Sequence, residues 1–321
     1  MVITARRKYD RGIALLATLL AVSLMTLLVI EFTTSAALGY RSAANLANQI
    51  RASYLARSGI QVGLAVLARD SLNDALQKTP HDGLDEAWAQ PIAPIVVDGG
   101  VVSLSIVDET RKIDVNNLFN KRTMQVDPAM EAMLLRLFSN IGVSPDLMPV
   151  LIDWLDPDSI ESDGGAEAGY YLSLTPPYEP RNGPMPTIGD LRMLKGMNDA
   201  VFLQLSQYLT TMPEMRINVN TAPPQVLAAL APELENDPQL VEQIVQIRQA
   251  RPFLQITDLA NEIPGIGAIA ASGRLSSFVT MRSSYFTITA QGEFAGARKR
   301  IYATFRRNLN GTAMLMNWHE D

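Results

Sequence analysis

The longest run of apolar positions lies close to the N-terminus. Residues 13–30 are interrupted only by three hydroxyl side chains, which can bond back to a helix backbone. At 1.5 Å per residue this run would form a helix about 27 Å long, close to the roughly 30 Å hydrocarbon core of a membrane. Apolar positions then continue at helical spacing, and the first proline is Pro80. We therefore expect one helix over 13–78, with 13–30 in the membrane.

Alternation of apolar and polar positions predicts strands in two distant parts of the chain. Residues 95–97 and 101–107 flank an Asp-Gly-Gly turn, which is typical of a β-hairpin. Residues 285–290 and 300–306 alternate in the same way around a glycine-containing turn. These four segments predict one small antiparallel sheet. The basic residues at 298–300 and 306–307 indicate an edge strand, where positive charge discourages aggregation, and a contact with acidic neighbours is the alternative.

About 170 residues with helical spacing separate the two parts of the sheet. Within them, Lys112–Leu118 recurs in similar form as Arg216–Ala222, and each segment ends with residues suited to capping the next helix. We therefore expect an α+β fold with a large helical domain, made of two related modules, inserted between strands. The expected divisions are a basic leader at 1–12, the N-terminal helix at 13–78, a linker and the first part of the sheet at 79–111, the inserted helical domain at 112–275 with modules 112–212 and 216–275, the second part of the sheet at 276–309, and a C-terminal tail at 310–321.

Charge and composition narrow the classes of function. The chain has 27 Lys+Arg against 33 Asp+Glu, a net charge of −6, and the leader contributes +3, so the rest carries −9. By the positive-inside rule, the basic leader predicts a single-pass membrane protein with a cytoplasmic N-terminus and the bulk of the chain on the other side of the membrane. The absence of cysteine excludes disulfides and thiolate zinc sites. With only two histidines, an enzyme is disfavoured.

The junction between the leader and the apolar run bears on what happens to the helix. A removed signal peptide and a plain signal anchor both fit the run. In Arg11-Gly12-Ile13, however, a glycine separates the basic leader from the run. This resembles the prepilin peptidase site of type IV pilins and pseudopilins. The resemblance implies cleavage between Gly12 and Ile13, methylation of Ile13, and retention of the apolar helix.

The fifth residue after that junction departs from the pilin pattern. Pilin-like helices normally carry a glutamate there, which is thought to pair with the N-terminal amine of a neighbouring subunit. This chain has Ala17 at that position. The K component at the tip of the type II secretion pseudopilus is known for lacking this glutamate, so the departure favours a tip subunit.

Several motifs in the helical region resemble the general secretion pathway protein K family of minor pseudopilins. They are Leu151–Asp158, Tyr170-Tyr171, Arg181–Pro184 and Ile217–Pro223. The resemblance implies a pilin-like helix packed on the sheet, with two SAM-like or helix-hairpin-helix-like modules inserted. It further implies a tip subunit that primes the pseudopilus and supports export of folded proteins, without catalysis. The implied partners are the minor pseudopilins I, J and H, the prepilin peptidase, the secretin and the exoprotein substrates.

An acidic stretch is the strongest candidate for a metal site. Six carboxylates and no basic residue lie between Asp153 and Glu167, and a hard cation with about six to eight oxygen ligands would relieve their repulsion. The spacing does not match an EF-hand, so any site is irregular, and a solvated acidic loop is the alternative. The resemblance to protein K, whose helical domain binds calcium, favours calcium. The expected ligands, the first three preferred, are Asp156, Asp158, Glu167, Asp153, Glu161 and Asp163.

Three other functions compete with this interpretation. Residues 263–267 resemble the hairpin of helix-hairpin-helix modules, whose amides bind DNA phosphates. The charge of −9 and the acidic flanks argue against it, so we expect no nucleic-acid partner. A minor pilin of a type IV pilus would share the leader without needing the helical insertion. A carboxylate-based periplasmic hydrolase rests only on the acidic stretch.

Overall fold

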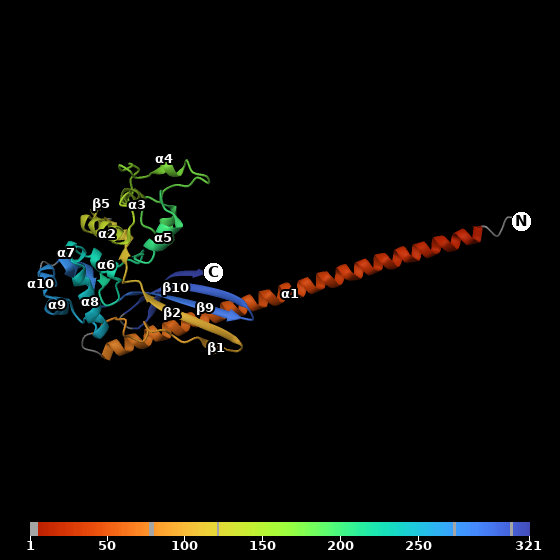
Figure 1. The fold of residues 1–321 in the computed structure, drawn as a ribbon, viewed down its shortest axis with the longest axis horizontal. Helices are drawn as coiled ribbons and strands as arrows, with labels where there is room; N and C mark the ends of the chain where they lie inside the picture. The colour runs from red at the N-terminus through yellow and green to blue at the C-terminus, as the bar shows by residue number, and fades with distance from the viewer. Residues whose placement is uncertain (1–5, 77–79, 121, 272–273, 309–310) are drawn as a thin grey trace.

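Helix α1 (Arg6–Leu76) organises the whole molecule. The computed structural model describes residues 6–76, 80–120, 122–271, 274–308 and 311–321. Figure 1 shows that the N-terminal part of α1 projects far beyond the other elements, while its C-terminal part lies along the sheet. The helix starts within the leader at Arg6 and covers most of the predicted range, and the predicted residues 77 and 78 lie outside the described residues.

The projecting part of α1 has the chemistry of a membrane span. This helix is long enough and apolar enough to cross a membrane. None of its most apolar 18-residue segment is buried in the protein. The hydroxyls of Thr18 and Thr26 donate to the carbonyls of Leu15 and Val22, at 2.8 Å each. These bonds satisfy two of the three hydroxyl groups of the run within the helix, which favours the predicted position in lipid.

The sheet has five antiparallel strands in the order β1-β2-β9-β10-β11. Their bounds are β1 (Ile95–Val97), β2 (Gly100–Asp108), β9 (Tyr285–Phe294), β10 (Ala297–Arg307) and β11 (Ala313–Glu320). Both predicted hairpins form. In the first, Asp98 and Gly99 have φ of 47° and 79°, as the tight turns favoured in hairpins require. The predicted antiparallel sheet, built from both ends of the chain, is confirmed.

Two predictions at the C-terminus are wrong. Residues 313–320 do not form a tail, because they pair with β10 from Ala313 to Glu320 as the fifth strand. As a consequence β10 is an interior strand, and its arginines do not protect an edge. Arg298 pairs with Glu293 across the hairpin, and Arg307 is buried in an ion-pair cluster. The sequence does not reveal β11 because its side chains are exposed on both faces, so the strand has no buried period.

Helix α1 packs on the sheet through a seam of small residues. A Cβ atom at Gly59 would lie 2.8 Å from the side chains of Ala290 and Val102, and one at Gly63 would lie 2.7 Å from Ile288. Opposite them, a Cβ at Gly292 would lie 2.6 Å from the backbone nitrogen of Ala56. The seam therefore brings the backbones of α1 and β9 into direct contact.

The inserted helical domain lies between β2 and β9 in the chain and consists of two consecutive sets of elements. In each set the first short strand pairs in parallel with the last, β3 with β6 and β7 with β8. One hydrophobic core runs through both sets. The fold class is therefore the predicted α+β arrangement with an inserted helical domain. The first set is β3 (Ile113–Asp114), η1 (Val115–Leu118), β4 (Phe119–Asn120), β5 (Gln125–Val126), α2 (Pro128–Ile141), α3 (Leu147–Leu155), α4 (Ala168–Tyr171), η2 (Ile188–Met193), α5 (Asp199–Leu205) and β6 (Leu209–Thr210), and the second is β7 (Ile217–Asn218), α6 (Pro224–Ala229), α7 (Pro232–Asn236), α8 (Pro238–Ala250), α9 (Ile256–Glu262), α10 (Pro264–Ala271), α11 (Arg274–Phe278) and β8 (Val279–Thr280).

The seam generates a prediction with a control in the same helix. We expect Gly59→Ala to lower the free energy of unfolding by about 1–3 kcal/mol, because the added methyl overpacks the contact with β9. Gly39→Ala gains the same helix propensity, and a Cβ there would have no atom within 4 Å. It should leave stability unchanged or raise it by up to ~1 kcal/mol. Thermal unfolding of the full chain in detergent measures both variants. Equal effects of the two would contradict the seam.

Candidate functional site

Two groups of carboxylates lie close enough to share a cation in the described part of the chain. One comprises Asp156, Asp158 and Glu167, and the other comprises Asp70, Asp82 and Glu86. In each group, one oxygen of every carboxylate lies within 4.8 Å of the others. The first group was predicted from sequence and the second was not. Their surroundings decide which of the two still needs a cation.

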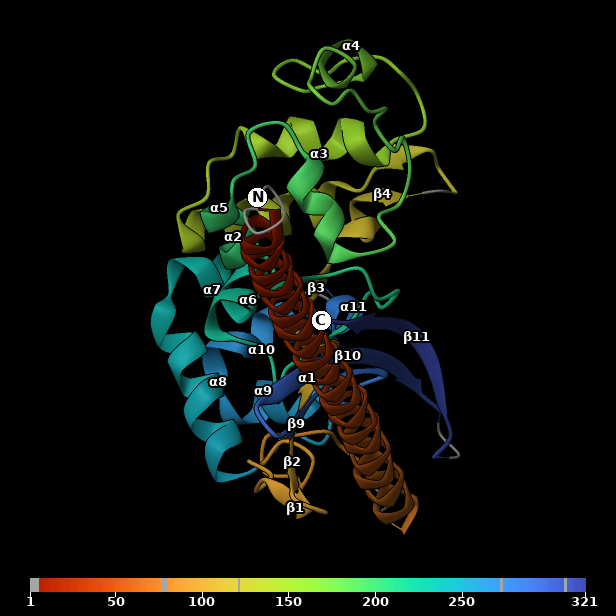
Figure 2. The same ribbon diagram turned by 90° about the vertical axis from the view of Figure 1, so that its right-hand side faces the viewer.

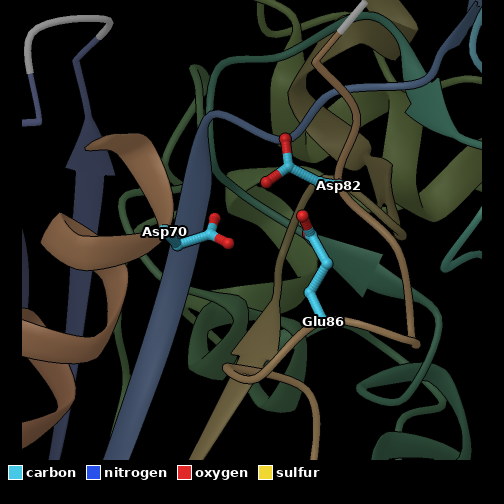
Figure 3. Close-up of side chains that lie close together, drawn as sticks. All are labelled: Asp70, Asp82 and Glu86. Atoms are coloured by element: carbon cyan, nitrogen blue, oxygen red, sulfur yellow. The ribbon is translucent and has the colours of Figure 1, made fainter. Parts of the chain in front are cut away.

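In the second group, two of the three carboxylates are already paired with an arginine. Figure 3 shows Asp70, Asp82 and Glu86 converging from the end of α1 and the segment after it. Arg307 of β10 pairs with Asp70 through Nη1 at 2.6 Å, and with Asp82 through Nη2, while its side chain is only 6% exposed. Burial raises the pKa of Glu86 to about 8 although Trp88 Nε1 donates to it, which disfavours its charged form. The group is therefore a paired structural cluster.

This cluster is part of a polar joint between the sheet and the inserted domain. Asp82 accepts a hydrogen bond from the backbone nitrogen of Ser283 at 2.7 Å, and the hydroxyl of Ser283 donates to Asp108 at 2.6 Å. The same carboxylate of Asp108 accepts from Thr221 in the second module. The joint thus links α1, β2 and the start of the second module. Isolated acidic residues near the end of an apolar helix were the only sequence signal for it.

Asp153, which is not a member of the first group, folds the acidic stretch back onto helix α3. Its carboxylate accepts from the backbone nitrogens of Ala166 at 2.8 Å and Ser162 at 3.2 Å, and the residue is fully buried. The close approach requires glycine at position 165, where a Cβ would lie 2.7 Å from the Asp153 carboxyl carbon. Asp153 therefore has a structural role here. Its oxygens are not among those that converge in the described structure.

The stretch that Asp153 holds brings Asp156, Asp158 and Glu167 together. Asp156 and Glu167 are buried, yet Asp156 Oδ1 and Glu167 Oε1 have no hydrogen-bond partner among the described residues. Burial raises the pKa of Asp156 to about 6, with the charges of Asp158, Asp153 and Glu167 acting in the same direction. Burial also raises the pKa of Glu167. A cation at this point would stabilise carboxylates that the protein itself leaves unpaired.

Asn182, which lies in the Arg181–Pro184 motif, is a further candidate ligand that the sequence did not predict. Its Nδ2 group donates to Glu167 Oε2 at 3.4 Å and contacts the carbonyl of Asp158, while its buried Oδ1 has no hydrogen-bond partner in the described structure. Carboxylate, amide and carbonyl oxygens are the ligands that calcium prefers. The other two predicted ligands, Glu161 and Asp163, are exposed and lie outside the convergent group.

The glycine-rich segment with the helix-hairpin-helix pattern also has a structural explanation. Only Ile263 separates α9 from α10, which begins at Pro264. A Cβ atom at Gly265 would lie 2.6 Å from Leu240 of α8. The glycine therefore allows α10 to pack closely on α8.

Comparisons with known proteins identify the family. The family models for type II secretion system (T2SS), protein K match residues 111–214 and 217–278. Type II secretion system protein K of Pseudomonas aeruginosa is 30% identical over 97% of this chain and 92% of its own length. The chain belongs to the type II secretion system protein K family. The protein of the same name from Klebsiella pneumoniae is 29% identical over 92% of this chain and 97% of its own length.

A solved structure shows the same fold. One chain in the crystal structure of the GspK-GspI-GspJ complex from enterotoxigenic Escherichia coli superposes with a TM-score of 0.70. The match covers 88% of this chain and 99% of that chain, at 18% identity. The minor pseudopilin family inferred from sequence is therefore supported by family models, full-length relatives and fold. All of the candidate calcium ligands lie in the first family-model match.

Proposed function

We propose that this family member is the minor pseudopilin at the tip of the type II secretion pseudopilus, where it primes assembly and supports export of folded proteins across the outer membrane. The observation that carries the proposal is the combination of one exposed apolar helix with a bulky inserted body. In Figure 2 the inserted helices form a body much wider than α1. Subunits inside a tightly wound shaft have neighbours above and below. A head of this size therefore fits best at the end of the filament.

The membrane arrangement follows from α1. Ile13 is 64% exposed at the start of the apolar run, and a Cβ at Gly12 would meet no atom within 4 Å, so this junction is open to a protease. The prepilin peptidase cuts between Gly12 and Ile13 and methylates Ile13. The helix then stays in the inner membrane with its start on the cytoplasmic side and the head in the periplasm. Ala17 offers no carboxylate to the amine of a subunit ahead of it.

The partners are other membrane-anchored minor pseudopilins. The similar chain named above was solved as part of a complex with GspI and GspJ, and we extend those partners, with component H, to this chain. The secretin and exoproteins are met at the tip. The role is mechanical, with neither catalysis nor nucleic-acid binding, since the tight packing of Gly265 accounts for the DNA-like motif.

The acidic group binds calcium. Asp156, Asp158, Glu167 and Asn182 supply the oxygens, and two of the carboxylate oxygens have no other partner in the described structure. The ion holds the long segment between α3 and η2 against the rest of the first module. Its role is to stabilise the head in the calcium-containing cell envelope.

A matched pair of double variants tests the calcium site. At a hundredfold excess over its Kd, calcium should stabilise the full chain by about 2.7 kcal/mol. Asp156→Asn with Glu167→Gln should remove most of this shift, whereas Glu161→Gln with Asp163→Asn should retain it. Without calcium, Asp156→Asn should raise the unfolding temperature, because it removes a buried charge from a like-charged group. Thermal unfolding of the full chain and of each variant, with calcium or with a chelator, measures these results. A calcium shift that survives the first double variant would contradict the assignment.

The secretion role is tested by deleting the gene and restoring it. Without this chain, exoproteins of the type II system should accumulate in the periplasm, and the full chain should restore their release and co-purify with components I and J in detergent. Type IV pilus motility and DNA uptake, measured in the same strains, should not change. Normal secretion in the deletion strain, or a loss of motility or uptake instead, would favour the rival functions.

A further inference from the structure

The two edges of the sheet differ in a way that packing within this chain does not explain. The first edge strand, β1, has three residues and follows Pro94. Short length and proline are common means of blocking the pairing of an edge with another chain. The other edge strand, β11, has eight residues, Ala313 to Glu320, without lysine or proline. In the described structure it pairs with β10 alone.

Apolar side chains on β11 are exposed on both faces of the sheet. Met314, Leu315, Met316 and Trp318 are between 38% and 50% exposed. Trp318 therefore differs from Trp88 and Trp154, which are buried. A long edge with several exposed apolar side chains and no lysine or proline is a template for strand addition.

The free backbone groups of β11 can be assigned from the register. Arg300 and Asp321 exchange both of their backbone hydrogen bonds, at 3.3 and 2.9 Å. Hydrogen-bonded and non-hydrogen-bonded pairs alternate along an antiparallel ladder. The backbone N–H and C=O groups of Glu320 and Trp318 therefore point away from β10, ready to pair with a further strand.

The position of β11 beside α1 indicates what kind of strand would add. Glu320 accepts a hydrogen bond from Ser53 at 2.5 Å and pairs with Arg57 at 3.2 Å. At the other end of the hairpin, a Cβ at Gly311 would lie 3.5 Å from Ser71. β11 thus runs along α1 toward the membrane-spanning part. A subunit anchored by a helix parallel to α1 would hold its own sheet at the same height.

We propose that β11 is the surface on which a neighbouring membrane-anchored, pilin-like subunit adds an edge strand of its own sheet. This inference rests on the proposed function, which supplies such subunits as partners. The partner strand bonds to the free groups of Trp318 and Glu320. Leu315 and Trp318 lie opposite Phe305 and Ala303 of β10, on the sheet face that α1 covers, so their side chains pack against the added strand beside α1.

Hydrogen exchange of the full chain, alone and in the complex with components I and J, tests the proposal. In the complex, the amides of Trp318 and Glu320 should exchange at least tenfold more slowly, while those of β1 should not change. Trp318→Lys should weaken co-purification about tenfold or more, because a lysine blocks strand addition. Val96→Lys on β1, where the side chain is 75% exposed, is the control and should have no effect.

The outcomes separate this proposal from the proposed function. If the complex forms and β11 exchanges as in the free chain, the strand-addition proposal is wrong and the secretion role stands. If protection of β11 appears in the free chain and rises with its concentration, the edge pairs with a second copy, which also overturns the proposal. If no complex forms at all, the proposed function is wrong, and the strand-addition proposal that rests on it is wrong as well. The exchange measurement does not depend on whether the lysine variant folds.

Discussion

Direct contact between the backbones of α1 and β9 is the constraint on which the rest of the structure depends. Gly292 brings the backbone of the central strand β9 against the backbone of α1, while at Gly59 and Gly63 the side chains of Ala290 and Ile288 lie directly against the helix. Because interiors are packed as closely as crystals, this approach fixes the position of the helix along the sheet. The head is therefore held rigidly on one end of a helix whose other end is exposed and apolar. Movement of the membrane helix would be transmitted to the head directly.

A second constraint determines how a large insertion is tolerated. The chain leaves the sheet after β2 and returns at β9, and these two strands are neighbours. Since the ends of the insertion lie side by side, the small sheet is not distorted by what it carries. The polar joint of Asp82, Ser283, Asp108 and Thr221 then ties the second module to the place where the chain crosses. Arg307 extends this tie to α1.

Sequence patterns predicted those parts of the fold that depend on local signals. The apolar run, the hairpin turns and the alternation in β2, β9 and β10 were all visible, because each element buries one face in a regular period. β11 was missed because its side chains are exposed on both faces, so that it has no buried period. The glycine seam was missed because the spacing of glycines within a helix does not show which strand they face.

The candidate site was predicted in part for the same reason. The density of carboxylates pointed to one segment, and within it the structure brings the three preferred residues together. It could not show that Asp153 bonds to backbone amides, nor that Asn182 returns to the group from fifteen residues beyond Glu167. Those contacts depend on how the loop closes, which sequence spacing does not encode.

The most direct test of the account is the N-terminus of the protein extracted from the inner membrane. Mass spectrometry should find an N-methylated Ile13 as the first residue, with the apolar helix still attached to the head. A chain that keeps its leader, or one that has lost the whole apolar run, would contradict the account.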